Sequence, residues 1–433
     1  MLIFGYNLLL CGIIFLCSPV ILILFIFKKR IRKRFHKRFH TNPGSAKTGS
    51  IWVHCASVGE VRTAAAFIHF MREESPHHSF LITTMTMSGM EMAKTLFPDI
   101  PARLFPLDLP WIVKSFLRKL RPSAILIAET EIWPNLYYYA AFYTIPIVVF
   151  NGRLSDNSYR RYRQFKWLFK GFLKKAHLFL MQDTENASRL HHLGVKKTRI
   201  LITGNLKYEI KIPDLLSISW LTHLKKQLVG RKILVAGSTH EGEEKILVTI
   251  FKKLKGHWPS LIMILAPRHA QRFHSVEKLL QSHRVHYLRK STLKENQDLM
   301  KVDIILLDTL GELLCVYSIA DIVFIGGSLV PIGGHTPLEA VAFSKPVIYG
   351  PHMENFREIA SYLKKEKAAL QVNNGKELAE TIDKLLYDRI LAHHTGEIGH
   401  RILIANRGTA ERIWMHVKKS LEMKQNAYRC YSL

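Results

Sequence analysis

The chain has 433 residues, a length that fits two domains of moderate size better than one core. Its 48% hydrophobic and 22% charged residues are typical of a globular protein, and the sequence has no low-complexity tract or fixed-period repeat. The formal net charge of +28 favours polyanionic partners, which include nucleic acid, anionic lipid headgroups and phosphorylated small molecules. The five cysteines are scattered and form no CxxC pair, so we expect no disulfide framework.

Residues 1–27 are predicted to be a membrane anchor. Leu8 to Phe27 form an uncharged run that, at about 1.5 Å per helical residue, reaches across a hydrocarbon core of about 30 Å. Pro19 leaves open a kinked helix or a shallow, monotopic insertion in place of a full crossing. A buried core helix is the remaining alternative.

Residues 28–48 are predicted to be a basic juxtamembrane segment. Its positive charges follow the apolar run, and none precedes that run: Lys28, Lys29, Arg30, Arg32, Lys33, Arg34, Lys37 and Arg38. A cleaved signal peptide has the reverse order. The positive-inside rule therefore predicts that the downstream domains lie on the cytoplasmic face of the membrane, where the segment would bind anionic lipids.

The rest of the chain contains two series of short apolar runs that are typical of buried parallel strands. The first series is Ile51–His54, Phe80–Thr84, Ala124–Ala128, Pro146–Phe150, Leu178–Met181 and Arg199–Thr203. The second is Lys232–Ala236, Leu261–Leu265, Asp303–Leu307, Asp321–Ile325 and Pro346–Tyr349. We therefore predict two doubly wound α/β domains, residues 49–211 and 231–400, with a linker at 212–230, a central cleft and a C-terminal helix and tail at 401–433.

Acidic residues follow two predicted strands of the first domain. Gly59 permits a tight turn that would present Glu60 at a helix start, where it is a candidate general base; the alternative is an acid that interacts with the helix dipole. Glu129 and Glu131 follow the strand that ends at Ala128, ahead of a helix-initiating proline. Two acids at the carboxyl end of a parallel sheet indicate a catalytic or ligand-binding role.

Two cations follow later strands of the same domain. Arg153 and Lys207 could bind phosphate or carboxylate, and solvated loop cations are the alternative.

The loops of the second predicted domain resemble anion-binding turns. Ala236–Glu244 joins a strand to a helix, and the glycine pairs at 326–327 and 333–334 precede another helix, so backbone N–H groups could approach a phosphate there. The chain has no GxGxxG or Walker A pattern. Glu244 stands where an HExxH zinc motif beginning at His240 would need its second histidine, and we expect no metal site.

Taken together, these motifs resemble the Kdo (3-deoxy-D-manno-oct-2-ulosonic acid) transferases of lipopolysaccharide synthesis. The matching segments are VGE at 58–60, ETEIWPN at 129–135, NGRLS at 151–155, GNLK at 204–207, STHEGEE at 238–244, PRH at 267–269, LGE at 310–312 and GGSL…GGHTPLEA at 326–340. The resemblance implies a GT-B fold, with an acceptor-binding N-terminal domain and a CMP-sugar-binding C-terminal domain. It also implies inverting transfer of Kdo from CMP-Kdo to a membrane-embedded lipid A precursor, lipid IVA, without a metal or another cofactor. The membrane would then be the bacterial inner membrane.

The resemblance also implies roles for individual residues. Glu60 would be the general base, while Glu129 and Lys207 would stabilise the transition state. The implied CMP contacts are Pro267, Arg268, Leu310, Gly311, Glu312, Thr336, Pro337, Leu338 and Glu339. This sequence departs from the family pattern at Thr336, where Asn is usual, and at Gly152, where Ala is usual.

Two other functions compete with this one. A different GT-B transferase that acts on a membrane lipid would share most of these features. A basic protein that binds anionic lipid or nucleic acid would account for the net charge, but it gives no reason for acids at two strand ends. The sequence has no RRM, KH or helix-turn-helix signature, so we expect no nucleic-acid partner.

Overall fold

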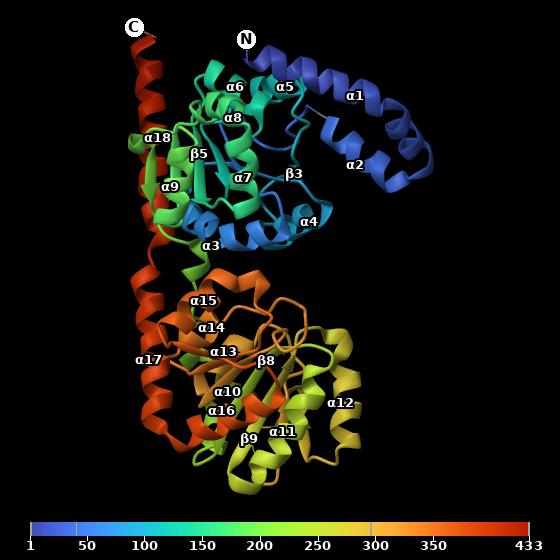
Figure 1. Ribbon diagram of the computed structural model, residues 1–433, viewed down its shortest axis with the longest axis vertical. Helices are drawn as coiled ribbons and strands as arrows, with labels where there is room; N and C mark the ends of the chain where they lie inside the picture. Colours follow the sequence, from blue (N-terminus) through green and yellow to red (C-terminus); the bar gives the residue numbers. More distant parts are fainter. Residues whose placement is uncertain (1, 40, 295–296, 432–433) are drawn as a thin grey trace. The chain divides into compact units, whose positions relative to one another are not determined.

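The computed structural model describes residues 2–39, 41–294 and 297–431, and the chain divides into two compact units (Figure 1). Unit 1 comprises Met1–Glu209 and Arg407–Leu433, and unit 2 comprises Ile210–Asn406. The predictions for Met1, His40 and Ser432–Leu433 lie outside the described residues, as do those for the side chains of Lys29, Arg30, Lys33 and Arg34. Each unit is a parallel α/β sheet with helices on its two faces, as predicted.

Unit 1 contains a seven-stranded parallel sheet in the order β3-β2-β1-β4-β5-β6-β7. Its strands are β1 (Ile51–His54), β2 (Phe80–Thr84), β3 (Ala102–Leu104), β4 (Ile125–Ala128), β5 (Ile147–Gly152), β6 (Leu178–Met181) and β7 (Ile200–Ile202). The central strands are buried along their whole length, because helices cover both faces of the sheet.

Helices of unit 1 cover both faces of this sheet. The unit 1 helices are α1 (Leu2–Phe27), α2 (Lys29–Phe39), α3 (Val58–Glu74), α4 (Met87–Leu96), α5 (Pro110–Leu120), α6 (Pro134–Phe142), α7 (Asp156–Gln164), α8 (Lys166–Leu173), α9 (Thr184–His192) and α18 (Thr409–Tyr431). Of these, α1 and α2 pack on each other, and α1 packs on α6. Ile51 and Val53 face a core that includes residues of α3 and α18. Trp52 points to the opposite face and packs with residues of α5 and α6.

Unit 2 contains a second seven-stranded parallel sheet, in the order β10-β11-β9-β8-β12-β13-β14. Its strands are β8 (Lys232–Thr239), β9 (Leu261–Pro267), β10 (Tyr287–Arg289), β11 (Ile304–Leu306), β12 (Ile322–Ile325), β13 (Val347–Tyr349) and β14 (Ala369–Gln371). Its helices are α10 (Ser219–Gln227), α11 (Glu243–His257), α12 (Phe273–Ser282), α13 (Leu313–Ile319), α14 (Leu338–Val341), α15 (Arg357–Lys365), α16 (Gly375–Tyr387) and α17 (Arg389–Asn406).

The C-terminal region differs from the single helix and tail predicted at 401–433. α17 ends at Asn406 in unit 2, and α18 begins at Thr409 in unit 1. Gly408 has a φ of +78°, which breaks the helix. Arg412 then fastens the start of α18 to unit 1, since its Nε donates to the carbonyl of Thr203 at 2.8 Å. The predicted linker, 212–230, likewise contains α10 and forms part of unit 2.

The N-terminal apolar segment is helical, and both ends of its hairpin with α2 contact the α/β part of unit 1. Of the described helices, α1 is the one that is long and apolar enough to cross a membrane, over Leu2–Val20, and none of that window is buried. Near its start, the Asn135 amide donates to Asn7 Oδ1 at 2.8 Å. Near the end of α2, Arg38 Nε donates to the carbonyl of Phe105 at 2.9 Å.

Candidate functional site

The predicted catalytic acids of unit 1 follow two adjacent strands. β1 pairs with β4, with His54 opposite Ile127, and the order of the sheet reverses between them. Ligands of open α/β sheets bind at the carboxyl ends of strands beside such a reversal. The chain runs from β1 into the turn that carries Glu60, and from β4 directly into Glu129.

Glu60 is held at the start of α3 by the turn that precedes it. Ser57 caps the helix by accepting the Glu60 N–H, and the Glu60 carboxylate accepts the Ala56 N–H at 2.7 Å and the Ser57 hydroxyl at 3.1 Å. This reciprocal arrangement is close to a capping box. Glu60 therefore has the helix-terminal role that was the alternative interpretation, and the same bonds fix the direction of its carboxylate.

The surroundings of Glu60 raise its affinity for a proton. Burial and then repulsion from Glu129 raise the pKa of Glu60 to about 7, although the bonds from Ala56 and Ser57 act in the opposite direction. Glu131 contributes a smaller repulsion. Three carboxylates therefore lie within electrostatic range of one another, and Glu60 has a pKa suited to general acid–base catalysis near neutral pH.

Glu129 has a backbone conformation that is rare for a residue with a side chain. Its φ is +55°, and its N–H donates to the carbonyl of Phe150 on the neighbouring strand at 3.0 Å. Asn151, the penultimate residue of β5, has a φ of +50°. Left-handed residues other than glycine cost free energy and cluster at functional sites, so their presence at two adjacent strand ends supports a site here.

Glu131 is bound to the sheet beneath it. Its Oε2 atom lies 2.9 Å from His54 Nε2, and His54 is buried and also bonds to Thr83. Trp133 Nε1 donates to the same oxygen at 3.0 Å. Burial alone would raise the pKa of Glu131, but the His54 and Trp133 bonds outweigh it and hold the pKa below its usual value.

Lys207 lies on a short helical turn that packs against the Glu60 helix. The 3₁₀ turn η2 (Leu206–Tyr208) contacts α3, and the Leu206 N–H donates to Asn151 Oδ1 at 2.9 Å. Lys207 is therefore attached to the end of β5 through a buried bond. Arg153 directly follows β5, so it lies at the carboxyl edge of the sheet, as Lys207 does after β7.

In unit 2 the structure corrects one expectation about anion binding. The N–H groups of Gly327, Ser328 and Leu329 all donate to the Glu243 carboxylate, at 2.6 to 3.0 Å, as does the His240 N–H at 2.9 Å. Backbone groups that were expected to meet a ligand phosphate are thus occupied by a buried acid of the chain itself. Sequence reasoning missed this role of Glu243, since the residue reads as an ordinary acid in a first helical turn.

Basic side chains gather beside that loop. His240 Nε2 lies 2.9 Å from His335 Nε2, and the His240 and His269 rings are 5.4 Å apart. Burial lowers the pKa of His240, and neighbouring His269, Arg272 and Arg268 lower it further. The cluster can attract an anion through its side chains. The three histidines were not predicted as site residues, although all lie in motifs that the sequence singled out.

The predicted CMP contacts all lie in unit 2, at or after the carboxyl ends of its strands. Pro267 ends β9, and the Arg268 N–H donates to the carbonyl of Thr239 at 3.0 Å. Thr336 and Pro337 lead into α14, whose second residue is Glu339. Burial raises the pKa of Glu339, and the charge of Arg268 opposes that shift.

The third group of predicted contacts precedes α13. Leu310 is exposed and Gly311 has a φ of +84°. The Glu312 carboxylate accepts from Thr309 Oγ1 and Lys290 Nζ.

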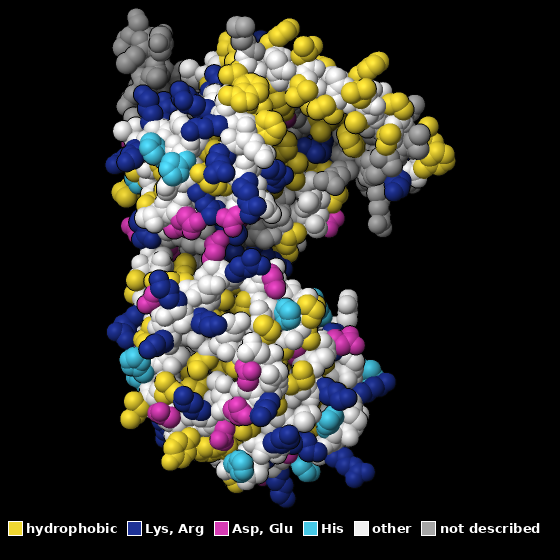
Figure 2. All heavy atoms as spheres, in the orientation of Figure 1, with side chains coloured by type: hydrophobic (Ala, Val, Ile, Leu, Met, Phe, Trp, Pro, Cys, Tyr) yellow, Lys and Arg dark blue, Asp and Glu magenta, His cyan; other side chains and the backbone are white. Residues whose placement is uncertain are grey.

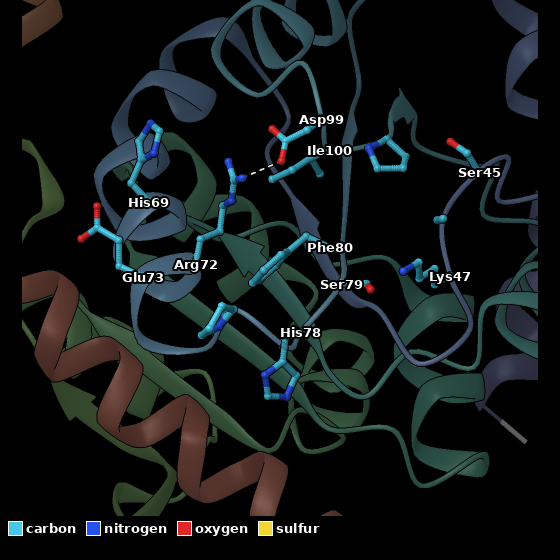
Figure 3. Close-up of a pocket in the computed structure, with 13 residues that line it drawn as sticks. Ser45, Lys47, His69, Arg72, Glu73, His78, Ser79, Phe80, Asp99 and Ile100 are labelled. Atoms are coloured by element: carbon cyan, nitrogen blue, oxygen red, sulfur yellow. Dashed lines mark hydrogen bonds and ion pairs between the residues drawn. The ribbon is translucent and has the colours of Figure 1, made fainter.

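A separate hollow of about 710 Å³ lies at the opposite, amino end of the unit 1 strands (Figure 3). It is lined by residues such as Lys47, His69 and Arg72, and an ion pair joins Arg72 to Asp99 at 2.5 Å. None of the predicted site residues lines it. Because parallel α/β sheets bind ligands at the carboxyl ends of their strands, we place the candidate site at the Glu60 end.

Comparisons with known proteins identify the family of the chain. Residues 29–210 match the family model described as 3-deoxy-D-manno-octulosonic-acid transferase (kdotransferase), and residues 271–401 match that of glycosyl transferases group 1. The chain is 37% identical to the 3-deoxy-D-manno-octulosonic acid transferase of Haemophilus influenzae, over 86% of this chain and 87% of the relative. It is 33% identical to that of Rickettsia prowazekii, over 78% of this chain and 72% of the relative.

Solved structures show the same fold at low sequence identity. A glycosyltransferase of Rickettsia africae superposes with a TM-score of 0.54 at 15% identity, over 88% of this chain and 99% of that one. The UDP-GlcNAc 2-epimerase of Neisseria meningitidis gives the same TM-score and identity, over 86% of this chain and all of that one. With its GT-B fold, the chain is a glycosyltransferase and belongs to the 3-deoxy-D-manno-octulosonic acid transferase family.

Proposed function

We propose that this enzyme transfers Kdo from CMP-Kdo to the lipid A precursor lipid IVA, with inversion at the anomeric carbon, during lipopolysaccharide synthesis. The observation that carries the proposal is the cluster of Glu60, Glu129 and Glu131, in which the pKa of Glu60 is raised to about 7. Family membership supports the Kdo donor. Unit 1 would bind the acceptor, and unit 2 would bind CMP-Kdo.

Glu60 acts as the general base. In its ionised form it takes the proton from a hydroxyl of the acceptor while that oxygen attacks the anomeric carbon of Kdo. The bond between this carbon and the CMP oxygen breaks on the opposite face, and CMP leaves with the bonding electrons. A positioned base contributes about 10²–10⁴-fold to such a step.

Glu129 and Lys207 stabilise charge as it develops. The anomeric carbon gains positive character as CMP departs, and a fixed anion nearby lowers the energy of that state. Glu129 is held at the end of β4 in a left-handed conformation, so little reorganisation is needed. Lys207 would offset negative charge on the leaving phosphate or on the Kdo carboxylate.

The CMP moiety would bind to the loops of unit 2. Arg268 would supply positive charge, and Glu243 fixes the neighbouring loop at Gly327 and the backbone of His240. The implied contacts at Leu310–Glu312 and Thr336–Glu339 follow strands of the same sheet. Neither the proposed chemistry nor these side chains calls for a metal ion or another cofactor.

The α1–α2 hairpin supports a monotopic membrane attachment on the cytoplasmic face. Asn7 bonds to Asn135, and Arg38 bonds to the Phe105 carbonyl, so both ends of the hairpin contact unit 1. A helix whose amino end stays beside the domain enters the membrane from that side and does not cross it. The basic residues after Phe27 would then lie among anionic headgroups.

The Glu60→Gln variant tests the proposed chemistry. We expect transfer of Kdo from CMP-Kdo to lipid IVA, measured as the mass increment of the lipid, to fall by about 10²–10⁴-fold, while CMP binding is retained. Glu74→Gln is a matched control, because Glu74 is an exposed acid on the same helix. Near-normal turnover by Glu60→Gln would remove Glu60 from this role. Product formed by the unaltered enzyme from a UDP-sugar, and none from CMP-Kdo, would favour a different GT-B transferase.

A further inference from the structure

A cavity of about 570 Å³ lies between α1, α2 and the loop that precedes α5. Tyr6, Leu10 and Ile14 contribute one face of α1, since they are spaced by four residues. Phe35 and Phe39 contribute the corresponding face of α2. Figure 2 shows hydrophobic side chains gathered over α1, so the apolar surface continues from the cavity onto the outside of the helix.

The charged groups that line the cavity are engaged with the protein. Asp108 accepts the N–H groups of Asn135 and Leu136 and the hydroxyl of Tyr6. Arg38 donates to the carbonyl of Phe105. The remaining lining is hydrocarbon and aromatic, and Ile14, Phe39 and Trp111 keep 39%, 46% and 58% of their surface exposed. A rim of that kind marks a site for an apolar ligand.

Trp133 connects this cavity with the carboxylate cluster. Its ring lines the cavity and packs on Phe105, while its indole N–H donates to Glu131 at 3.0 Å. Glu131 is within electrostatic range of Glu60. One side chain therefore marks the boundary between an apolar chamber and the polar reaction site, which is the boundary that a lipid has between its acyl chains and its headgroup.

We propose that this cavity binds one acyl chain of the acceptor lipid and so holds the acceptor hydroxyl at Glu60. The inference rests on the proposed function, because it assigns a place to part of that acceptor. Charge complementarity supports it: Arg38 lines the cavity and lowers the pKa of nearby Glu131, so a cation lies where the anionic headgroup would meet the protein. The apolar helix α1 would give the chain access from the bilayer.

Leu10→Trp tests the site by filling it, and Leu9→Trp is the matched control. Leu10 lines the cavity, whereas Leu9 is the neighbouring residue and is 60% exposed. In the full-length enzyme, Leu10→Trp should raise the KM for tetraacylated lipid IVA at least tenfold, which corresponds to about 1.4 kcal/mol. It should leave the reaction with a deacylated acceptor unchanged. An unchanged KM for lipid IVA, or an equal loss with both acceptors, would overturn the proposal. Ile14→Trp repeats the test if Leu10→Trp folds poorly, and CMP binding reports folding.

A binding measurement separates this inference from the proposed function. Lipid IVA with a photoreactive group on an acyl chain should label peptides from α1, α2 and residues 107–111 in the Glu60→Gln variant, without donor. Leu10→Trp should abolish the labelling and Leu9→Trp should not. If the labelling is found but the unaltered enzyme transfers no Kdo, the proposed function is refuted while the assignment of the cavity to an acyl chain stands. If bulk phospholipid prevents the labelling as well as unlabelled lipid IVA does, the cavity is a general membrane contact and the inference is overturned.

Discussion

Glu60 and Glu131 are two acids in one site whose surroundings act on their proton affinities in opposite directions. Burial dominates at Glu60 and raises its pKa to about 7, whereas bonds from His54 and Trp133 keep the pKa of Glu131 low. In such a pair, the acid with the raised pKa is suited to exchange a proton, and the acid with the lowered pKa stays charged. Glu131 was singled out in the sequence as one of two acids. Its pairing with buried His54 could not be predicted, because the two residues meet only in the folded sheet.

The raised pKa of Glu60 predicts the pH dependence of transfer. In the proposed mechanism the ionised form of Glu60 is the base, and its pKa lies above the usual value. The value of kcat/KM should therefore fall about tenfold per pH unit below pH 7 and level off above it. Initial rates with CMP-Kdo and lipid IVA over a pH series measure this. In Glu129→Gln, which removes a charge that raises the pKa of Glu60, the slower residual reaction should have its midpoint at lower pH. A midpoint that does not move in that variant would contradict the assignment.

Glu243 should be essential for donor binding without touching the donor. Glu243→Gln puts an amide N–H₂ group against backbone N–H donors, so at least one buried donor loses its acceptor, at a cost of about 1–3 kcal/mol. We expect a lower free energy of unfolding in urea and a weaker CMP affinity by calorimetry. Glu241→Gln is the control, since Glu241 is exposed in the same loop. Unaltered CMP binding in Glu243→Gln would contradict the role.

At the scale of elements, the sequence predicts the central strands well and the edges poorly. β1, β2 and β6 have the predicted bounds, because strands buried on both faces are continuous apolar runs. β3, β10 and β14 were not predicted. Each is a three-residue strand at a sheet edge, so its residues face solvent in part and carry a weaker pattern. The helix break at Gly408 was missed because apolar periodicity continues on both sides of it.

Asp108 couples the anchor helix to the catalytic loop. It caps α6, which begins directly after the ETEIW segment, and it accepts the hydroxyl of Tyr6 on α1. Asp108→Asn keeps one acceptor oxygen and loses the other, so we expect a loss of about 1–3 kcal/mol in unfolding free energy and a lower kcat. Asp99→Asn, in an exposed pair with Arg72, should cost less than about 1 kcal/mol. Equal effects of the two substitutions would contradict the coupling.

At the scale of the whole molecule, the anchor was read from the sequence as a segment of membrane-spanning length, with a shallow insertion as the alternative. The length and hydropathy of the segment are the same for a crossing helix and for a shallow insertion, because each of the two needs a long apolar run. The contacts of Tyr6 and Asn7 with unit 1 bear on the choice, and they join residues more than a hundred positions apart. In the proposed monotopic attachment, α1 would present its outer surface to one leaflet.

Cysteine crosslinking in native membranes tests this arrangement. With Cys11 and Cys17 replaced by serine, the pair Asn7→Cys and Asn135→Cys should form a disulfide under mild oxidation, since the two asparagine side chains are in hydrogen-bond contact at 2.8 Å. The pair Leu16→Cys and Asn135→Cys is the control and should stay reduced, because Leu16 is 77% exposed on the same helix. A helix that crossed the bilayer would carry position 7 to the far side of the membrane from Asn135. A reduced first pair in an active enzyme would therefore exclude the monotopic attachment and support the crossing.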